Sequence, residues 1–170
     1  MDQVFAVAWR YVVGLVLTED LPMEAAQLLA VGFDSPALRD LAGRARRDDA
    51  VEIRGLFRQA MGELGTGVPD WESAERCYLH HLAGQLAAGT GTPREVAANI
   101  WRRLTEAQTG PELEFLQAVG DEYYVEFISN ERPDAYQAWE TALRSAAEQL
   151  SQTTSAEIGG LRERSRSATG

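Results

Sequence analysis

Helix start and stop signals recur along this chain, and they limit what it can fold into. Proline opens apolar segments at Pro22, Pro36 and Pro93, in the first helical turn, where the missing N–H group sacrifices no hydrogen bond. Glycine follows other segments, as at Gly32 and Gly65, where helices commonly end. Between these signals apolar residues recur at three- and four-residue steps, without strong strand alternation. The sequence therefore predicts an all-α protein of seven or eight short-to-medium helices, in a single bundle or an orthogonally packed domain.

The stretch VGFDSPALRDLAG, residues 31–43, shows how these signals work together. A glycine ends one helix, Asp34 or Ser35 caps the next, and a proline opens it. Each notable residue then has a local structural task, which makes the stretch a joint between helices rather than a ligand-binding loop. Arg39 and Asp40 are left on the outer face, and we expect them to be available to a partner.

The sharpest single helix start is the segment TPRE. Thr92 takes the N-cap position and Glu95 the third helical position, the arrangement called a capping box. A later helix opened by Pro111 is expected to break near Gly120.

The predicted helical domain covers residues 1–150. From Ser151 the composition changes to Ser, Thr, Gly and Arg, with few side chains to bury. We therefore expect residues 151–170 to form a flexible C-terminal tail.

The charge of the chain bears on its partners. It has 26 acidic residues against 16 basic ones, all of them arginine, for a formal net charge of −10. Such a surface repels phosphate backbones and anionic lipids, and it suits a basic protein partner or simply solubility. The absence of lysine from the sequence excludes Schiff-base chemistry on a lysine.

Arginines gather in residues 39–58, where two short helices would fit a helix–turn–helix DNA reader. This span holds six arginines, but also four acids with which they can pair: Asp40, Asp48, Asp49 and Glu52. The resulting surface is only weakly basic on a strongly acidic chain, so we expect no nucleic-acid binding.

Cysteine usage and hydropathy indicate the compartment. Cys77 is the only cysteine, which rules out an internal disulfide and suggests a reducing environment. The apolar run at residues 4–17 is interrupted by Arg10, is too short to span a bilayer, and lacks the features of a signal peptide. We expect a cytoplasmic protein with no membrane association.

Cys77, His80 and His81, in the segment CYLHH, are the one cluster with metal-ligand side chains. A structural zinc site needs four ligands, and carboxylates would have to supply the others. Cys77 with His81 could also be considered as a nucleophile and its base, although such pairs usually come from separate elements. The simpler interpretation, which we favour, is a buried structural cysteine with histidines at the helix edge.

Carboxylates cluster in the segment DEYYVEF. If this segment is helical, Glu122 and Glu126 share a face, where they could perform acid–base chemistry, bind a cation or, with Asp121, contact a partner. The simpler interpretation is a solvated acidic face, with Tyr124 and Phe127 turned inward.

Three segments, DLPMEAAQLLAVGFDSPALRDLAG, PREVAANIW and FLQAVGDEYYVEF, resemble a family of small uncharacterised helical proteins of actinobacteria and other Gram-positive bacteria. The resemblance covers most of residues 20–150, and its most specific part is GFDSPALRDLAG. It implies an all-helical fold. The family has no established activity or catalytic residues, so no functional residue carries over to this chain. The resemblance also implies a link, in some members, to toxin–immunity systems.

These observations favour a non-enzymatic interaction module, immunity- or antitoxin-like, that presents an acidic surface to a basic protein partner. No cofactor is expected, and the oligomeric state is left open. One alternative is a small-ligand or cofactor-binding protein with a pocket lined by tryptophans. Another is an enzyme that uses Cys77 with His81, or Glu122 with Glu126. The tryptophans concerned are Trp9, Trp71, Trp101 and Trp139.

Overall fold

The computed structural model describes residues 3–103 and 107–167, and in these ranges the chain is helical without a strand. The predicted all-α class is therefore confirmed. The described residues contain ten helices, nine α and one 3-10, rather than seven or eight. One additional element is the short helix η1 (Thr18–Asp20), and another arises because the chain breaks at Gly120. No helix in these ranges is both long enough and apolar enough to cross a membrane.

The chain divides into two compact units, where the sequence predicted one domain over residues 1–150. Unit 1 comprises Met1–Glu75 with Ile158–Gly170, and unit 2 comprises Arg76–Glu157. Two long helices, α5 (Trp71–Ala87) and α9 (Pro133–Ser167), contribute residues to both units. A sequence-based boundary is hard to place here because both divisions fall inside continuous helices.

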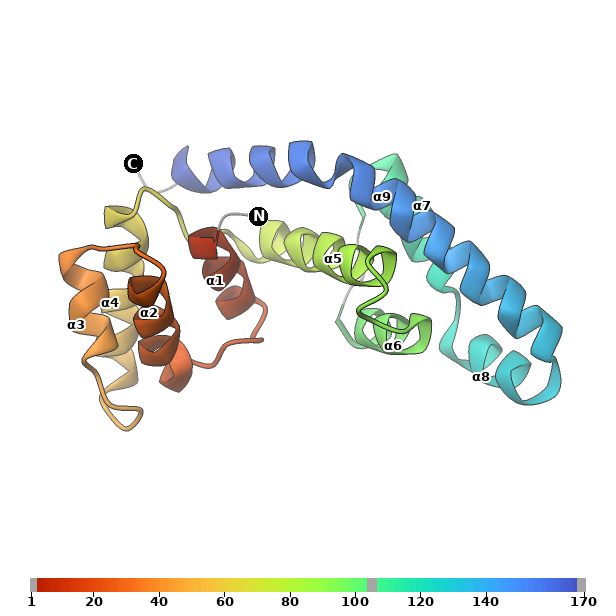
Figure 1. The fold of residues 1–170 in the computed structure, drawn as a ribbon, viewed down its shortest axis with the longest axis horizontal. Helices are drawn as coiled ribbons and strands as arrows, with labels where there is room; N and C mark the ends of the chain where they lie inside the picture. The colour runs from red at the N-terminus through yellow and green to blue at the C-terminus, as the bar shows by residue number, and fades with distance from the viewer. Residues whose placement is uncertain (1–2, 104–106, 168–170) are drawn as a thin grey trace. The chain divides into compact units, whose positions relative to one another are not determined.

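Unit 1 is built on three helices that pack side by side, α2 (Leu21–Ala30), α3 (Pro36–Ala42) and α4 (Ala50–Glu63) (Figure 1). Helix α1 (Gln3–Val12) adds its apolar face. The buried side chains recur at helical spacing and form one cluster, as the sequence pattern predicted. This cluster includes Val4, Val7, Ala8, Leu21, Leu28, Leu38, Leu41, Ile53, Phe57 and Met61.

The joint between α2 and α3 has the predicted local structure. Gly32 has a φ of +95°, a backbone conformation that favours glycine. Ser35, rather than Asp34, caps α3, and its hydroxyl accepts a hydrogen bond from the Leu38 N–H at 3.2 Å. The Ala37 N–H donates to Glu63 of α4 at 2.9 Å, and this bond lowers the pKa of the Glu63 carboxyl group. The stretch is a structural joint.

Unit 2 contains most of α5 and α9, together with α6 (Pro93–Arg103), α7 (Gly110–Val119) and α8 (Glu122–Glu131). The predicted capping box at the start of α6 is present. The Glu95 N–H donates to the Thr92 hydroxyl at 3.2 Å, and the Thr92 N–H donates to the Glu95 carboxylate at 3.0 Å. The predicted break near Gly120 also occurs, since this residue has a φ of +71° and separates α7 from α8.

The expected flexible tail is, as far as Ser167, a continuation of α9 (Figure 1). Ile158, Leu161 and Ser165 are buried. Their spacing places them on one helical face, so they can contribute to a core although the segment is poor in apolar residues. The prediction was wrong here because it weighed composition and overlooked this spacing. The last three residues of the predicted tail lie outside the described ranges.

Candidate interaction face on helix α8

Helix α8 presents three large aromatic side chains to solvent. The exposed fractions are 81% for Tyr123, 56% for Tyr124 and 55% for Phe127. These residues are three or four positions apart, or adjacent, so they lie on adjoining parts of the same helical surface. Isolated exposed apolar residues are ordinary, whereas a contiguous group of aromatic side chains makes this surface a candidate for an interaction.

The opposite side of α8 anchors it in unit 2. Val125 and Ile128 are buried, with exposed fractions of 1% and 2%. The sequence-based expectation that Tyr124 and Phe127 turn inward is therefore wrong. Both pairs have a spacing of three residues, and the structure buries the aliphatic pair while leaving the aromatic one outside.

The start of α8 is held by hydrogen bonds from three side chains. Asp121 caps the helix and accepts from the Tyr124 N–H at 3.1 Å. Trp101 donates its indole N–H to the Gly120 carbonyl at 2.8 Å, and Trp139 donates to the Val119 carbonyl at 3.1 Å. Two tryptophans thus bind consecutive carbonyls at the joint, and this fixes the direction in which α8 leaves α7.

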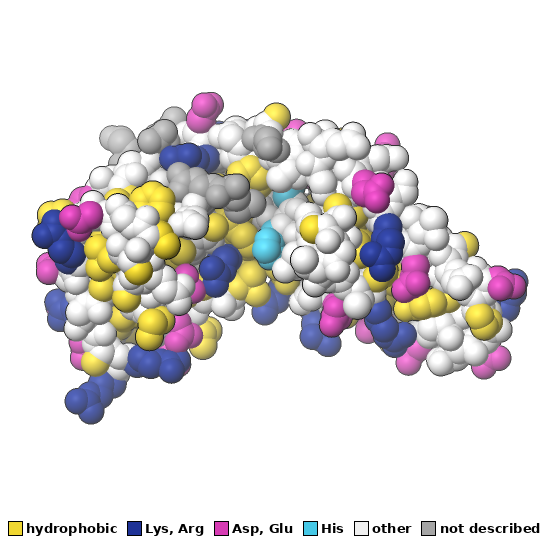
Figure 2. Space-filling view, viewed as in Figure 1, with side chains coloured by type: hydrophobic (Ala, Val, Ile, Leu, Met, Phe, Trp, Pro, Cys, Tyr) yellow, Lys and Arg dark blue, Asp and Glu magenta, His cyan; other side chains and the backbone are white. Residues whose placement is uncertain are grey.

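Unpaired carboxylates surround the aromatic side chains. Among the described residues, no basic group forms an ion pair with Glu122, Glu126 or Glu131. Figure 2 shows hydrophobic side chains beside acidic ones over α8. We call this surface the α8 face, and it comprises Asp121, Glu122, Tyr123, Tyr124, Glu126, Phe127 and Glu131. Three of the residues that the sequence singled out for partner binding, Asp121, Glu122 and Glu126, lie on it.

The other two predicted partner residues belong to unit 1. Arg39 is already paired, since its guanidinium donates to both carboxylate oxygens of Asp34 at 2.8 and 3.2 Å. Asp40 is exposed, and the described residues give it no ion pair. Arg39 is therefore not the free cation that the sequence suggested.

The three metal-ligand candidates differ in their burial and partners. Cys77 and His80 are buried, and His81 is partly exposed. The ring nitrogens of His80 both have partners, with Nδ1 2.9 Å from the Thr154 hydroxyl and Nε2 3.0 Å from a Glu112 oxygen. No group of three potential metal ligands occurs in the described residues.

His80 belongs to a buried polar network that the sequence did not reveal. At its centre Glu112 accepts four hydrogen bonds: from Arg76 at 2.9 Å, from His80 at 3.0 Å, and from the Gln108 and Thr109 N–H groups at 2.9 and 3.0 Å. The last of these completes a second capping box, at the start of α7. The segment TGPE has the capping-box pattern, so this part of the network could have been found from sequence.

The electrostatics of the network stabilise an ionised carboxylate. Burial disfavours the charged form of Glu112, but hydrogen bonds from His80, Gln108 and Arg76, and the charge of Arg76, outweigh it and lower the pKa of the carboxyl group to about 2. Arg76 also binds Gln108 and Glu157 of α9, each at 2.9 Å. The network therefore ties α5, α7 and α9 together inside unit 2.

Thr154, His80 and Glu112 have the hydrogen-bond order of a hydrolytic triad, with the imidazole between a hydroxyl and a carboxylate, but not the access that a triad needs. His80 and Glu112 are fully buried, with side-chain exposed fractions of 0%. A buried imidazole does not meet a substrate that arrives from solvent, and four donors hold the Glu112 carboxylate in place. We assign the network a structural role.

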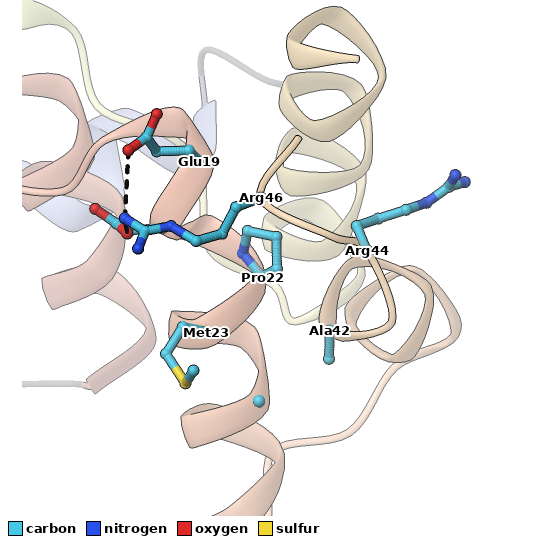
Figure 3. Close-up of a pocket in the computed structure, with 8 residues that line it drawn as sticks. Glu19, Pro22, Met23, Ala42, Arg44 and Arg46 are labelled. Atoms are coloured by element: carbon cyan, nitrogen blue, oxygen red, sulfur yellow. Dashed lines mark hydrogen bonds and ion pairs between the residues drawn. The ribbon is translucent and has the colours of Figure 1, made fainter. Parts of the chain in front are cut away.

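Two shallow grooves occur in unit 1. The first, about 260 Å³, has an apolar floor that includes Pro22, Met23 and Ala42 (Figure 3). Arg46 lies across it and pairs with Glu19 at 3.3 Å and Asp20 at 2.5 Å. The second, about 220 Å³, is lined by α1 and α2 and holds the Arg10–Glu24 pair at 3.0 Å.

Neither groove supports the predicted tryptophan-lined pocket. Both are smaller than most small-molecule sites, and the ion pairs described above already engage most of their charged groups. Trp9 and Trp139 are buried, Trp71 is exposed, and none of the four tryptophans lines either groove. The observed tasks of Trp101 and Trp139 are the hydrogen bonds at the α7–α8 joint.

No protein family, curated protein or solved structure was found to match this chain. The resemblance of its segments to a family of helical Gram-positive proteins stays a prediction. The α8 face is therefore the feature of the described residues from which we infer a function.

Proposed function

We propose that this chain is a non-enzymatic protein-interaction module whose α8 face binds a basic protein partner. The observation that carries the proposal is the exposure of Tyr123, Tyr124 and Phe127 on one short helix, among carboxylates that have no ion-pair partner in the described ranges. Tyrosine is among the residues that contribute most to binding energy when an interface covers it. A surface of this composition fits a partner with apolar pockets and a basic rim.

The charges of the α8 face and of the whole chain act in the same direction. Glu122, Glu126 and Glu131 supply local negative charge, and the formal charge of −10 adds a long-range attraction for a basic molecule. Complementary charge chiefly raises the association rate and excludes like-charged partners. The aromatic side chains would then supply the affinity once they are buried.

An immunity- or antitoxin-like role is the specific form of this proposal. The resemblance to helical Gram-positive proteins implies such a link for some members. A protein of this kind acts by occupying a surface of its target, which requires no catalytic group. The full burial of the His80 and Glu112 side chains is in keeping with a non-catalytic protein.

The proposal can be tested by affinity capture from a lysate of the source organism at low salt. Three baits are compared: the wild type, the double variant Tyr123→Ser/Phe127→Ser, and the control Met23→Ser. Met23 is 64% exposed and lies in unit 1, so its replacement also removes an exposed apolar side chain. Capture is followed by mass spectrometry of the bound proteins.

We expect one stoichiometric basic protein on the wild type and on the control, and its loss from the α8 variant. Equal recovery on all three baits would show that the α8 face does not carry the interaction. Recovery of a partner that has no basic surface would contradict the charge argument.

A further inference from the structure

Helix α4 of unit 1 has an outer side that no part of its own unit covers. Val51 is 68% exposed, Arg58 follows it two helical turns later, and Arg54 lies at the edge of the same surface. The buried residues Ile53 and Phe57 occupy the opposite side. An aliphatic side chain is thus exposed next to two cations.

The acids around α4 are engaged, whereas several of its arginines are not. Glu52 pairs with Arg44 at 2.6 Å, Asp48 accepts from the Ala45 N–H at 2.9 Å, and Asp49 accepts from the Val51 N–H at 2.6 Å.

In contrast, within the described part of the chain Arg47, Arg54 and Arg58 form neither an ion pair nor a side-chain hydrogen bond. Asp48 and Asp49 keep their negative charge, because a backbone N–H does not neutralise a carboxylate, so this surface is weakly basic. We call Val51, Arg54 and Arg58 the α4 face.

The α4 face and the α8 face complement each other in charge and chemistry. Among the described residues, the first has two unpaired guanidinium groups on the same helix as an exposed valine, and the second has three unpaired carboxylates beside three exposed aromatic rings. Guanidinium groups bind carboxylates through paired hydrogen bonds and also stack on aromatic faces. Gly55 leaves room for a ring to approach the helix, because a Cβ there would meet nothing within 4 Å.

We propose that the α4 face of one copy of this chain binds the α8 face of a second copy. This inference rests on the proposed function, since it uses the same α8 face. It assigns the basic contact to a local surface, the α4 face, of a second copy whose formal charge as a whole is −10. The contact joins two different surfaces, so each pair of copies leaves one α4 face and one α8 face open. Further copies can then add to the assembly as the protein concentration rises, unless the copies close into a ring.

A charge-exchange experiment tests the pairing directly. The variant Arg54→Glu/Arg58→Glu makes the α4 face acidic, and Glu122→Arg/Glu126→Arg makes the α8 face basic. Each variant alone then places like charges opposite each other. A mixture of the two restores opposite charges at both kinds of contact. Arg102→Glu/Arg144→Glu changes the net charge as the first variant does, at exposed arginines of unit 2, and serves as the control.

Sedimentation velocity over a concentration series at moderate salt measures the outcome. We expect the average mass of the wild type and of the control to rise with concentration. Arg54→Glu/Arg58→Glu alone and Glu122→Arg/Glu126→Arg alone should each stay at the monomer mass. A mixture of these two variants should associate.

Two outcomes would overturn the inference: a wild type that stays monomeric at every concentration, or a mixture that does not associate when each variant alone is monomeric. Far-ultraviolet circular dichroism of each variant shows whether it is folded. The lysate capture separates the two proposals. If the wild type is monomeric but the Tyr123→Ser/Phe127→Ser variant still loses a basic lysate protein, the second copy is excluded and the proposed function is retained.

Discussion

Glu112 and His80 are joined by a 3.0 Å hydrogen bond between Oε1 and Nε2, and neither side chain is exposed. Because an ionised carboxylate only accepts, the proton of this bond belongs to His80. The same oxygen accepts from Arg76 at 2.9 Å. Replacement of Glu112 therefore leaves two buried donors with a weaker acceptor or none.

The substitution Glu112→Gln should destabilise the protein by about 3–5 kcal/mol, the usual cost of removing one partner from a buried ion pair. Urea unfolding of the wild type and the variant measures this difference. Glu114→Gln removes an exposed carboxylate from the same helix and is the matched control. A variant as stable as this control would show that the network contributes little to the fold.

Acid should weaken the protein through the same carboxylate. The folded state lowers the pKa of Glu112 from 4.5 to about 2, so the carboxylate contributes its full stabilisation above pH 4.5 and loses it as the pH falls toward 2. The shift corresponds to about 3 kcal/mol. The free energy of unfolding of the wild type and of Glu112→Gln, measured from pH 7 downward, should converge below pH 4.5. A difference in unfolding free energy between the two proteins that stays constant over this pH range would contradict the lowered pKa of Glu112.

Two glycines should respond in opposite directions to alanine. Gly84 lies inside α5, where a Cβ would meet nothing within 4 Å, so Gly84→Ala should stabilise the helix by about 0.5–1 kcal/mol. Gly120 has a φ of +71°, which a residue with a Cβ rarely adopts, so Gly120→Ala should destabilise. Thermal unfolding of both variants checks the pair. A change in stability of the same sign in both variants would contradict the helical conformation of Gly84 or the positive φ of Gly120.

Local signals predicted much of the helix pattern. Ser35, the Thr92–Glu95 pair and Gly120 act within a few residues of themselves, and each begins or ends a helix as expected. The length of α9 was not predictable in this way. Burial of Ile158 and Leu161 depends on distant parts of the fold, which composition does not report.

The candidate site was predictable only in part. Asp121, Glu122 and Glu126 were identified by charge alone, and all three are exposed. Which side of α8 is buried could not be decided, because positions 124 and 127 have the same spacing as positions 125 and 128. The partners of Glu112 are 32 and 36 residues away in the chain, at His80 and Arg76, and only tertiary structure brings them together.

Neighbouring residues on α8 provide a direct test of its orientation. Ile128 is 2% exposed, so Ile128→Ala should cost about 2–5 kcal/mol of unfolding free energy. Phe127 is 55% exposed. Phe127→Ala should therefore change the free energy of unfolding by no more than about 0.5 kcal/mol, although this substitution removes the larger side chain. Chemical denaturation of the two variants compares them. A larger loss of stability in Phe127→Ala than in Ile128→Ala would show that Phe127, and not Ile128, is turned inward.

The carboxylates of the α8 face should control how fast a partner binds. In Glu122→Gln/Glu126→Gln two negative charges are lost with little change in shape, so the association rate with the captured partner should fall while the dissociation rate changes little.

The wild-type association rate should also fall with added salt, because ions screen exposed charges beyond a distance of about 8–10 Å. Stopped-flow or surface-based kinetics at two salt concentrations measures both effects. The variant should depend less on salt than the wild type, since part of the attraction that salt screens has been removed. If the association rates of the two proteins depend equally on salt, the charges that attract the partner lie elsewhere on the chain.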